Sequence, residues 1–183
     1  MAKTSAIDNS PPSKEDSSYP ISVSKSSSPE VVEGVHRFFN NVGISAFIPE
    51  NNQSKDFYSD ILRYLLKAAS VQRGRISCVF SVQPVVANYY GGLHGSAVAA
   101  IAERVGIACA RTIVAEDKEI FLGELSISYL SAAPQKEVLV VDGSVVRSGR
   151  NLTVVAMEFK IKRTGKLGFT ARATFYHMPP AKL

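Results

Sequence analysis

A run of small and apolar residues between positions 94 and 112 constrains this chain more than any other feature. The glycines before it and the alanine, valine and isoleucine residues within it predict a helix over this range. Small residues recur nearly all the way round that helix, at Ala97, Ala99, Ala100, Ala102, Gly106, Ala108 and Ala110. A helix that is apolar on every side is expected to be buried, and small side chains let a sheet approach it closely. The chain should therefore fold around this helix.

Segments rich in β-branched and aromatic residues surround the helix. One precedes it, RISCVFSVQPVVAN, where Pro84 suggests an edge or a bulge. After it come IFLGELSISYLSAA, EVLVVDGSVVRSG, NLTVVAMEFKIKRTG and KLGFTARATFYH, separated by turn signals. The second and third turns are short enough for hairpins. A strand, a long apolar helix and a meander of antiparallel strands predict an α+β hotdog fold, in which the sheet curls around the central helix.

The composition of the sequence before this region changes twice. Residues 1–29 are rich in serine and proline and poor in large apolar residues, which predicts a disordered tail. Residues 30–55 should form a helix over 31–41, in PEVVEGVHRFFNNVG, and the loop IPENNQSK. A further helix is expected in DFYSDILRYLLKAAS, where apolar residues form one stripe. The expected organisation is a folded domain over 56–178 with a short C-terminal tail over 179–183.

Composition limits the classes of function. The formal net charge of +5 and the pI near 9.2 favour an anionic partner without identifying it. A nucleic acid is not expected, because the basic strands lack interleaved aromatic residues. Cys78 and Cys109 lie in apolar segments at no metal-ligand spacing. We therefore expect buried free thiols in a reducing compartment, with no metal and no other cofactor. No apolar stretch reaches the roughly 18 residues of a membrane span.

The turn before the helix, NYYGGLHG, carries candidate binding residues. Gly91, Gly92 and Gly95 let the backbone approach a ligand, and the first helical N–H groups are unpaired donors at the positive end of the helix dipole. Such donors suit an oxyanion or a polarised carbonyl oxygen. Asn88 either caps the turn or holds a water or the His94 ring, and we expect that ring to be neutral beside the dipole. Alternatively, the turn has a purely geometric role.

Glu103 is a carboxylate in the middle of an apolar pattern. It follows Gly95 by eight residues, or about 12 Å along a helix axis, so one subunit cannot bring both to one substrate carbonyl. If they act together, the carboxylate comes from a second subunit whose helix runs antiparallel beside the first, and a two-fold dimer then has two sites. Alternatively, Glu103 pairs with Arg104 or Arg111, or lies on a solvated edge of the helix.

The motif Asn-x-x-Gly-x-Leu-His-Gly, with a carboxylate eight residues after its last glycine, resembles the acyl-CoA thioesterases of the hotdog superfamily. The likeness is to the branch of PaaI and thioesterase superfamily member 2, over residues 56–177, and includes SISYLSAA and VVRSGRNLTVVAMEFKIK. It implies that the Gly95 amide polarises the thioester carbonyl, while Glu103 of a partner subunit acts as general base or nucleophile. Asn88 and His94 would position the water and the loop. It also implies a homodimer or a homotetramer.

Some positions depart from that likeness. Ser96 stands where many members carry a second glycine, Glu103 where the nearest branch has aspartate, and Leu122 where that branch has serine on the following strand. We therefore expect water to be positioned differently from the nearest branch, and we expect Ser96 to be a substrate-binding residue together with Gly91, Gly92 and Arg150.

Basic residues gather on the hairpins after the helix, at Arg147, Arg150, Lys160, Lys162, Arg163 and Lys166. Because coenzyme A carries phosphates, a basic rim is expected in such an enzyme, with Arg150 the foremost candidate for a phosphate contact. The alternative is a solvated face of edge strands, where lysine also discourages aggregation.

The sequence therefore predicts an enzyme of lipid metabolism that hydrolyses a fatty or aryl acyl-CoA to the free acid and coenzyme A. A hotdog hydratase or dehydratase, and a non-catalytic acyl-CoA binding or sensing module, are the alternatives. The segment Ala181-Lys182-Leu183 resembles the Ser-Lys-Leu type of peroxisomal address, which implies an import receptor as a partner. The cytosol, or a plastid or mitochondrion reached through the N-terminal tail, is the alternative location.

Overall fold

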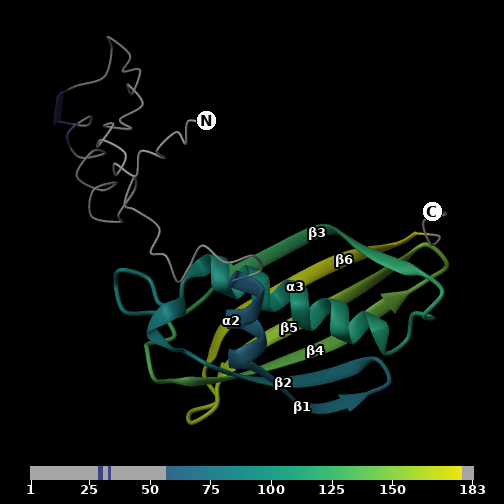
Figure 1. Ribbon diagram of the computed structural model, residues 1–183, viewed down its shortest axis with the longest axis horizontal. Helices are drawn as coiled ribbons and strands as arrows, with labels where there is room; N and C mark the ends of the chain where they lie inside the picture. Colours follow the sequence, from purple (N-terminus) through teal and green to yellow (C-terminus); the bar gives the residue numbers. More distant parts are fainter. Residues whose placement is uncertain (1–28, 31–32, 34–56, 179–183) are drawn as a thin grey trace, which may run out of the picture. The chain divides into compact units, whose positions relative to one another are not determined.

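The computed structural model describes residues 29, 30, 33 and 57–178 (Figure 1). The chain divides into two compact units, Met1–Gln53 and Ser54–Leu183, and every named helix and strand belongs to the second. Residues 29, 30 and 33 are helical. The rest of the helix expected over 31–41, the tail expected over 1–29 and the segment 179–183 lie outside the described residues.

The second unit contains one antiparallel sheet and a long helix. Its elements are α2 (Phe57–Leu65), β1 (Leu66–Gln72), β2 (Arg75–Ser81), a 3₁₀ helix (Pro84–Val86), α3 (Gly95–Arg111), β3 (Glu119–Tyr129), β4 (Val138–Ser148), β5 (Leu152–Ile161) and β6 (Leu167–Met178). The strand order is β1-β2-β4-β5-β6-β3, and every neighbouring pair is antiparallel. α3 lies along one face of this sheet (Figure 1). The predicted hotdog fold and its central helix are confirmed.

Small residues let α3 lie close to the sheet, as the sequence predicts. A Cβ added at Gly106 would lie 2.9 Å from Cζ of Phe175 on β6, and one added at Gly143 on β4 would lie 3.2 Å from Cγ1 of Val105. The helix face toward the sheet is buried and consists of Ala97, Val98, Ile101, Ala102, Val105, Gly106, Cys109 and Ala110. Cys78 and Cys109 are buried free thiols, also as predicted.

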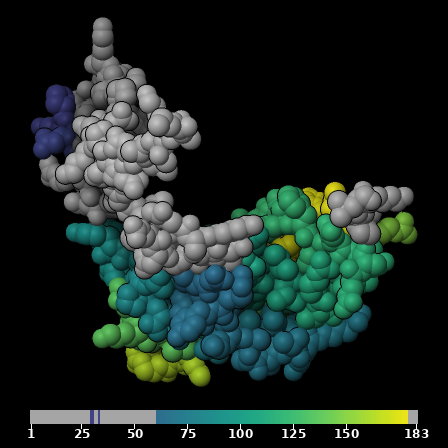
Figure 2. All heavy atoms as spheres, in the orientation of Figure 1, coloured from purple at the N-terminus to yellow at the C-terminus, as the bar shows by residue number. Residues whose placement is uncertain are grey.

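The other face of α3 is not buried within one subunit. Ala99, Ala100, Ile107 and Ala108 are half-exposed there, and Glu103 lies among them. Residues of α3 form part of the surface on this side of the molecule (Figure 2). The expectation of a helix buried on every side is therefore wrong for the single chain, which leaves a half-exposed apolar strip around one carboxylate.

The helix expected in DFYSDILRYLLKAAS is shorter than predicted. α2 ends at Leu65, and the next residues, Leu66–Gln72, form β1. β1 pairs with β2 across a turn in which Gly74 has a φ of 75°. The apolar stripe of α2 continues through Leu66, but glycine permits the tight turn, and a hairpin then satisfies the backbone groups of the following residues.

Two predictions for the strands are also wrong. The strand expected in RISCVFSVQPVVAN stops at Ser81, and Pro84 begins the 3₁₀ helix instead of marking an edge or bulge. The strands after α3 do not form a single meander, because β3 pairs with β6 and not with β4. The loop between β3 and β4 is bound to the start of α3, where the Leu93 N–H donates to the Ala133 carbonyl at 2.8 Å. The segment between β3 and β4 thus passes the start of α3.

The two edges of the sheet differ in character. β1 forms one edge, its side chains are exposed from Lys67 to Gln72, and its register shifts between Ala68 and Ser70. β3 forms the other edge and presents the exposed ring of Phe121. Within the part of the chain that the structure describes, neither outer edge pairs with another strand.

Candidate active site

A tight turn precedes α3 and is organised by Asn88. The Asn88 Oδ1 accepts hydrogen bonds from the N–H groups of Tyr90 at 3.0 Å and Gly92 at 3.1 Å. The Gly91 N–H donates to the Asn88 carbonyl at 3.0 Å, and the Asn88 N–H donates to the Gly92 carbonyl at 2.7 Å. Gly91 has a φ of 74°, a conformation that favours glycine. The N–H groups of Gly91 and Gly92 therefore donate to acceptors within the turn. Of the two roles expected for Asn88, the structure shows that it caps the turn.

His94 caps the N-terminus of α3. Its Nδ1 accepts from the Ser96 N–H at 3.2 Å and lies 2.8 Å from the Ser96 Oγ, while the His94 N–H donates to the Val86 carbonyl at 2.8 Å. A backbone N–H can only donate, so Nδ1 must be unprotonated and a neutral ring carries its proton on Nε2. The side chain is exposed. Ser96, which departs from the family motif, is thus a direct partner of the His94 ring.

Gly95 is the first residue of α3, so its N–H has no acceptor within the helix. None of the hydrogen bonds among the described residues uses this donor. The hydroxyl of Tyr129, at the end of β3, donates to the Gly95 carbonyl at 3.1 Å. A Cβ added at Gly95 would lie 3.5 Å from the tyrosine ring. Tyr129 therefore contacts the candidate site directly. Sequence reasoning singled out its segment, SISYLSAA, but not this residue.

Glu103 lies half-buried in the middle of α3. One helical turn away on either side are Ala99, Ala100 and Ile107, all half-exposed. No ion pair among residues 57–178 involves Glu103, and Arg111 instead donates to the Lys118 carbonyl at 2.6 Å. Because Gly95 and Glu103 lie on one straight helix, a single subunit does not bring them together.

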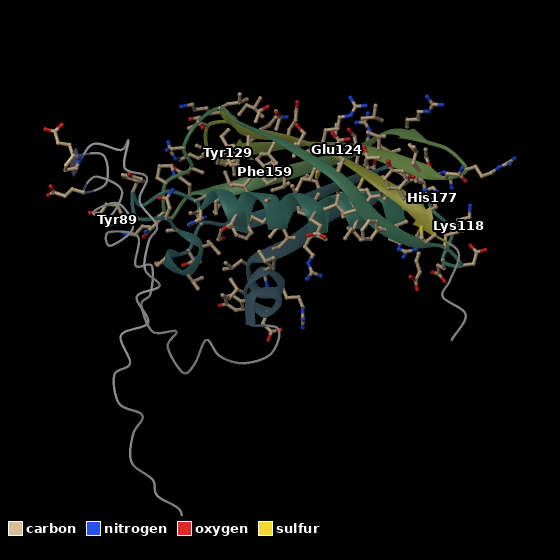
Figure 3. The ribbon with its side chains drawn as sticks, turned by 90° about the horizontal axis from the view of Figure 1, so that it is seen from above. Tyr89, Lys118, Glu124, Tyr129, Phe159 and His177 are labelled. Atoms are coloured by element: carbon tan, nitrogen blue, oxygen red, sulfur yellow. The ribbon has the colours of Figure 1, made fainter. Side chains whose placement is uncertain are left out.

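Arg150 lies far from the glycine turn within one chain. Its carbonyl is 3.1 Å from Nδ1 of His177 and accepts from Nζ of Lys118 at 3.4 Å. Figure 3 places His177 and Lys118 toward one end of the sheet, whereas Tyr89 and Tyr129 lie toward the other. Arg150 and Gly95 therefore belong to opposite ends of the same subunit.

A buried hydroxyl connects the β4–β5 hairpin to β6 near Arg150. Thr153 is fully buried, and its Oγ1 lies 2.8 Å from Oγ of Ser148 and 2.9 Å from Nε2 of His177. These contacts hold the hairpin that carries Arg150 against the C-terminal strand.

The described residues contain no group of side chains that could hold a metal ion. Among them no helix is both long and apolar enough to cross a membrane.

Hollows large enough for a small ligand include one of about 610 Å³ lined by Ile61, Leu65 and Val85, and one of about 470 Å³ on the outer face of β2, β4 and β5. Neither includes a residue of the glycine turn.

Comparison with known proteins identifies relatives of this region. Residues 90–167 match the model of the thioesterase superfamily. This range begins in the glycine turn, contains all of α3 and ends at the start of β6. The Caenorhabditis elegans protein F42H10.6, which carries an esterase name, is 28% identical over 109 residues, or 60% of this chain and 64% of the relative. The chain thus spans less than two thirds of the length of that relative.

Solved structures share the fold. Zebrafish thioesterase superfamily member 2 superposes with a TM-score of 0.62 at 22% identity, covering 68% of this chain and 88% of the other. A Streptococcus mutans protein bound to acetyl-CoA superposes with a TM-score of 0.58 at 20% identity, covering 64% of this chain and 91% of the other. A thioesterase from Haemophilus influenzae gives 0.60 at 18% identity, covering 65% and 82%. At these identities the likeness concerns the fold.

Proposed function

We propose that this protein hydrolyses a fatty or aryl acyl-CoA to the free acid and coenzyme A, because residues 90–167 match the thioesterase superfamily and the chain has the fold of solved thioesterases. One observation carries the proposal. Among the described residues the Gly95 N–H at the start of α3 has no acceptor, and the same helix holds a half-buried Glu103 that forms no ion pair within them. A donor that stabilises the developing oxyanion and a carboxylate that takes a proton from water can together catalyse thioester hydrolysis.

The two groups meet only if two copies of the chain combine. In the proposed dimer the helices run antiparallel, so that Glu103 of one copy faces Gly95 of the other and each dimer has two sites. The half-exposed strip of Ala99, Ala100 and Ile107 around Glu103 is suited to such a contact. The open edge of β3 and its exposed Phe121 offer a second, adjacent surface for the same two-fold pairing. Arg150 would then approach the site from the second copy.

The proposed reaction starts with the thioester carbonyl oxygen at the Gly95 N–H. Glu103 of the second copy takes a proton from water while the water oxygen bonds to the carbonyl carbon, and the negative charge develops on the carbonyl oxygen. When the intermediate collapses, the C–S bond breaks, and the coenzyme A sulfur receives the proton from the Glu103 carboxyl. His94, with its proton on Nε2, is a further donor beside the oxyanion, and Asn88 holds the turn in place.

Hydrolysis of short, long and aromatic acyl-CoAs, followed by release of free thiol, tests this proposal. We expect Glu103→Gln to reduce kcat by about 100-fold or more, because the amide cannot accept the proton of water. Glu116→Gln is the matched control, since Glu116 is exposed in the loop after α3. Analytical ultracentrifugation of each variant establishes that folding and dimer formation are intact. Equal loss in both variants, or hydrolysis by a monomer, would contradict the proposed site.

A non-catalytic acyl-CoA binding module is the second candidate, and one position favours it. Leu122, where the nearest branch has serine, packs against the hydrophobic core and offers no hydroxyl to a water. This candidate predicts binding of acyl-CoA, measured by calorimetry, without release of thiol from any member of the panel. The two candidates therefore differ in turnover and not in binding.

A further inference from the structure

We propose that Tyr129 is a positioning residue of this site, acting through the Gly95–Ser96 peptide to hold His94 as an Nε2–H donor. The inference rests on the proposed function for its effect on hydrolysis. Its structural part concerns the protein without substrate and stands on the contacts at the start of α3.

The first step is the hydrogen bond from β3 to the helix. The Tyr129 hydroxyl donates to the Gly95 carbonyl at 3.1 Å, an oxygen that already belongs to the first turn of α3. A hydrogen bond to a peptide carbonyl polarises the whole peptide unit, because the donors and acceptors of a chain strengthen one another. The N–H of this peptide unit is that of Ser96.

The second step leads from that peptide to the imidazole. The Ser96 N–H donates to Nδ1 of His94 at 3.2 Å. The order of the chain is therefore the Tyr129 hydroxyl, the Gly95–Ser96 peptide and the His94 ring. The Ser96 N–H can donate to Nδ1 only when that nitrogen is unprotonated. The Ser96 hydroxyl, 2.8 Å from the same nitrogen, can donate to it in that state as well. The chain therefore favours the tautomer that carries its proton on Nε2. That proton is then directed away from the helix cap, from a side chain that is exposed.

The aromatic neighbours fix the tyrosine to the sheet. The Tyr129 ring meets Phe169 of β6 edge-on, with centroids 5.8 Å apart, and Phe169 meets Phe159 of β5 in the same way at 5.9 Å. Phe159 is fully buried and Phe169 nearly so. Figure 3 shows Tyr129 and Phe159 close together at the same end of the sheet. The packing of its ring on the sheet thus fixes the position of the Tyr129 hydroxyl independently of the turn. The hydroxyl can therefore position the Gly95–Ser96 peptide and, through it, His94.

Replacement of Tyr129 by phenylalanine removes the hydroxyl and keeps the ring packing. We expect Tyr129→Phe to lower kcat by about three- to tenfold with little change in KM, since one neutral hydrogen bond is lost. In the protein without substrate, ¹⁵N NMR of labelled histidine should show His94 changing from one dominant tautomer to a mixture. Tyr176→Phe is the control: Tyr176 is 47% exposed against 56% for Tyr129, and its hydroxyl makes no hydrogen bond within the described residues.

The two readouts separate the failure of the inference from the failure of the proposed function. Unchanged His94 nitrogen shifts in Tyr129→Phe would overturn the inference, whether or not the protein is an enzyme. A wild-type protein that hydrolyses no thioester would overturn the proposed function, while the NMR comparison still decides whether Tyr129 sets the His94 tautomer. An equal loss of kcat in Tyr176→Phe would show that any lost hydroxyl on these strands has the same effect and would also refute the role of Tyr129.

Discussion

The contact between α3 and the sheet can be tested at Gly106. The change Gly106→Ala adds one methyl group, which would lie 2.9 Å from Cζ and 3.0 Å from Cε2 of Phe175, and 3.5 Å from Cε of Met157. Phe175 is 0% exposed and Met157 1% exposed, so both side chains are enclosed by the core and cannot move out into solvent. The substitution therefore has two opposing effects on stability: alanine favours the helix, and its methyl group crowds the core.

The magnitudes predict which of these effects is larger. Alanine favours the interior of a helix over glycine by about 1 kcal/mol. Forcing an extra carbon into a full core costs about 1–3 kcal/mol, and contacts at or below 3.0 Å place this site toward the upper part of that range. We expect Gly106→Ala to lower the free energy of unfolding by about 1–2 kcal/mol.

Urea denaturation gives the free energy of unfolding and shows through the m-value whether the unfolded state has changed. A double-mutant cycle with Phe175→Leu identifies the cause. That variant alone destabilises, because it leaves a void. The double variant should be more stable than the sum of the single effects predicts, by about 1 kcal/mol.

A rise in stability for Gly106→Ala would refute this reasoning, because it would mean that helix propensity outweighs the contact with Phe175. An additive double-mutant cycle would also refute it, since the two sites would then not interact.

Other predictions concern buried groups. Thr153→Val should lower the free energy of unfolding by about 1 kcal/mol in urea denaturation, because His177 and Ser148 lose a buried partner; an unchanged midpoint would contradict this. Burial, and then the neighbouring Cys78, raise the pKa of the Cys109 thiol to about 11 from an ordinary 9.0. The native protein should therefore not react with a thiol reagent near neutral pH, whereas the unfolded protein should. Because the folded state keeps this proton longer than the unfolded state, the free energy of unfolding should fall as pH rises from 9 toward 11, and a stability that rose there would contradict the assignment.

Where local pattern and final packing agree, the sequence was sufficient to predict the fold. α3 could be predicted because its small residues and its apolar periodicity both serve the contact with the sheet, as at Gly106. β1 could not, because its residues from Lys67 onward are exposed on both faces and show no alternation of burial. Its strand conformation comes from backbone pairing with β2, which local periodicity does not encode. The place of β3 beside β6 comes from pairing between strands that are distant in the sequence, which local periodicity does not encode.

The candidate site divides in the same way. Gly95 and Glu103 stand out in the sequence because a glycine before a helix and a carboxylate within an apolar helix are local anomalies. Tyr129 does not stand out, since a tyrosine at the end of a strand is common, and it contacts Gly95 across a separation of 34 residues. Ser96 looked like a departure from a motif, and only its distance to Nδ1 of His94 shows what its side chain contacts.

The unlike edges of the sheet limit how far the sheet can be extended by strand pairing between copies of the chain. In the proposed dimer, two-fold pairing uses both β3 edges and leaves a longer sheet that ends in β1 at each side. Each β1 edge has a register shift at Ala68 and Ser70 and carries Lys67, features that oppose the addition of another strand. Strand pairing can therefore join two copies of the sheet but adds no third, so it produces a particle of finite size and not an open-ended filament.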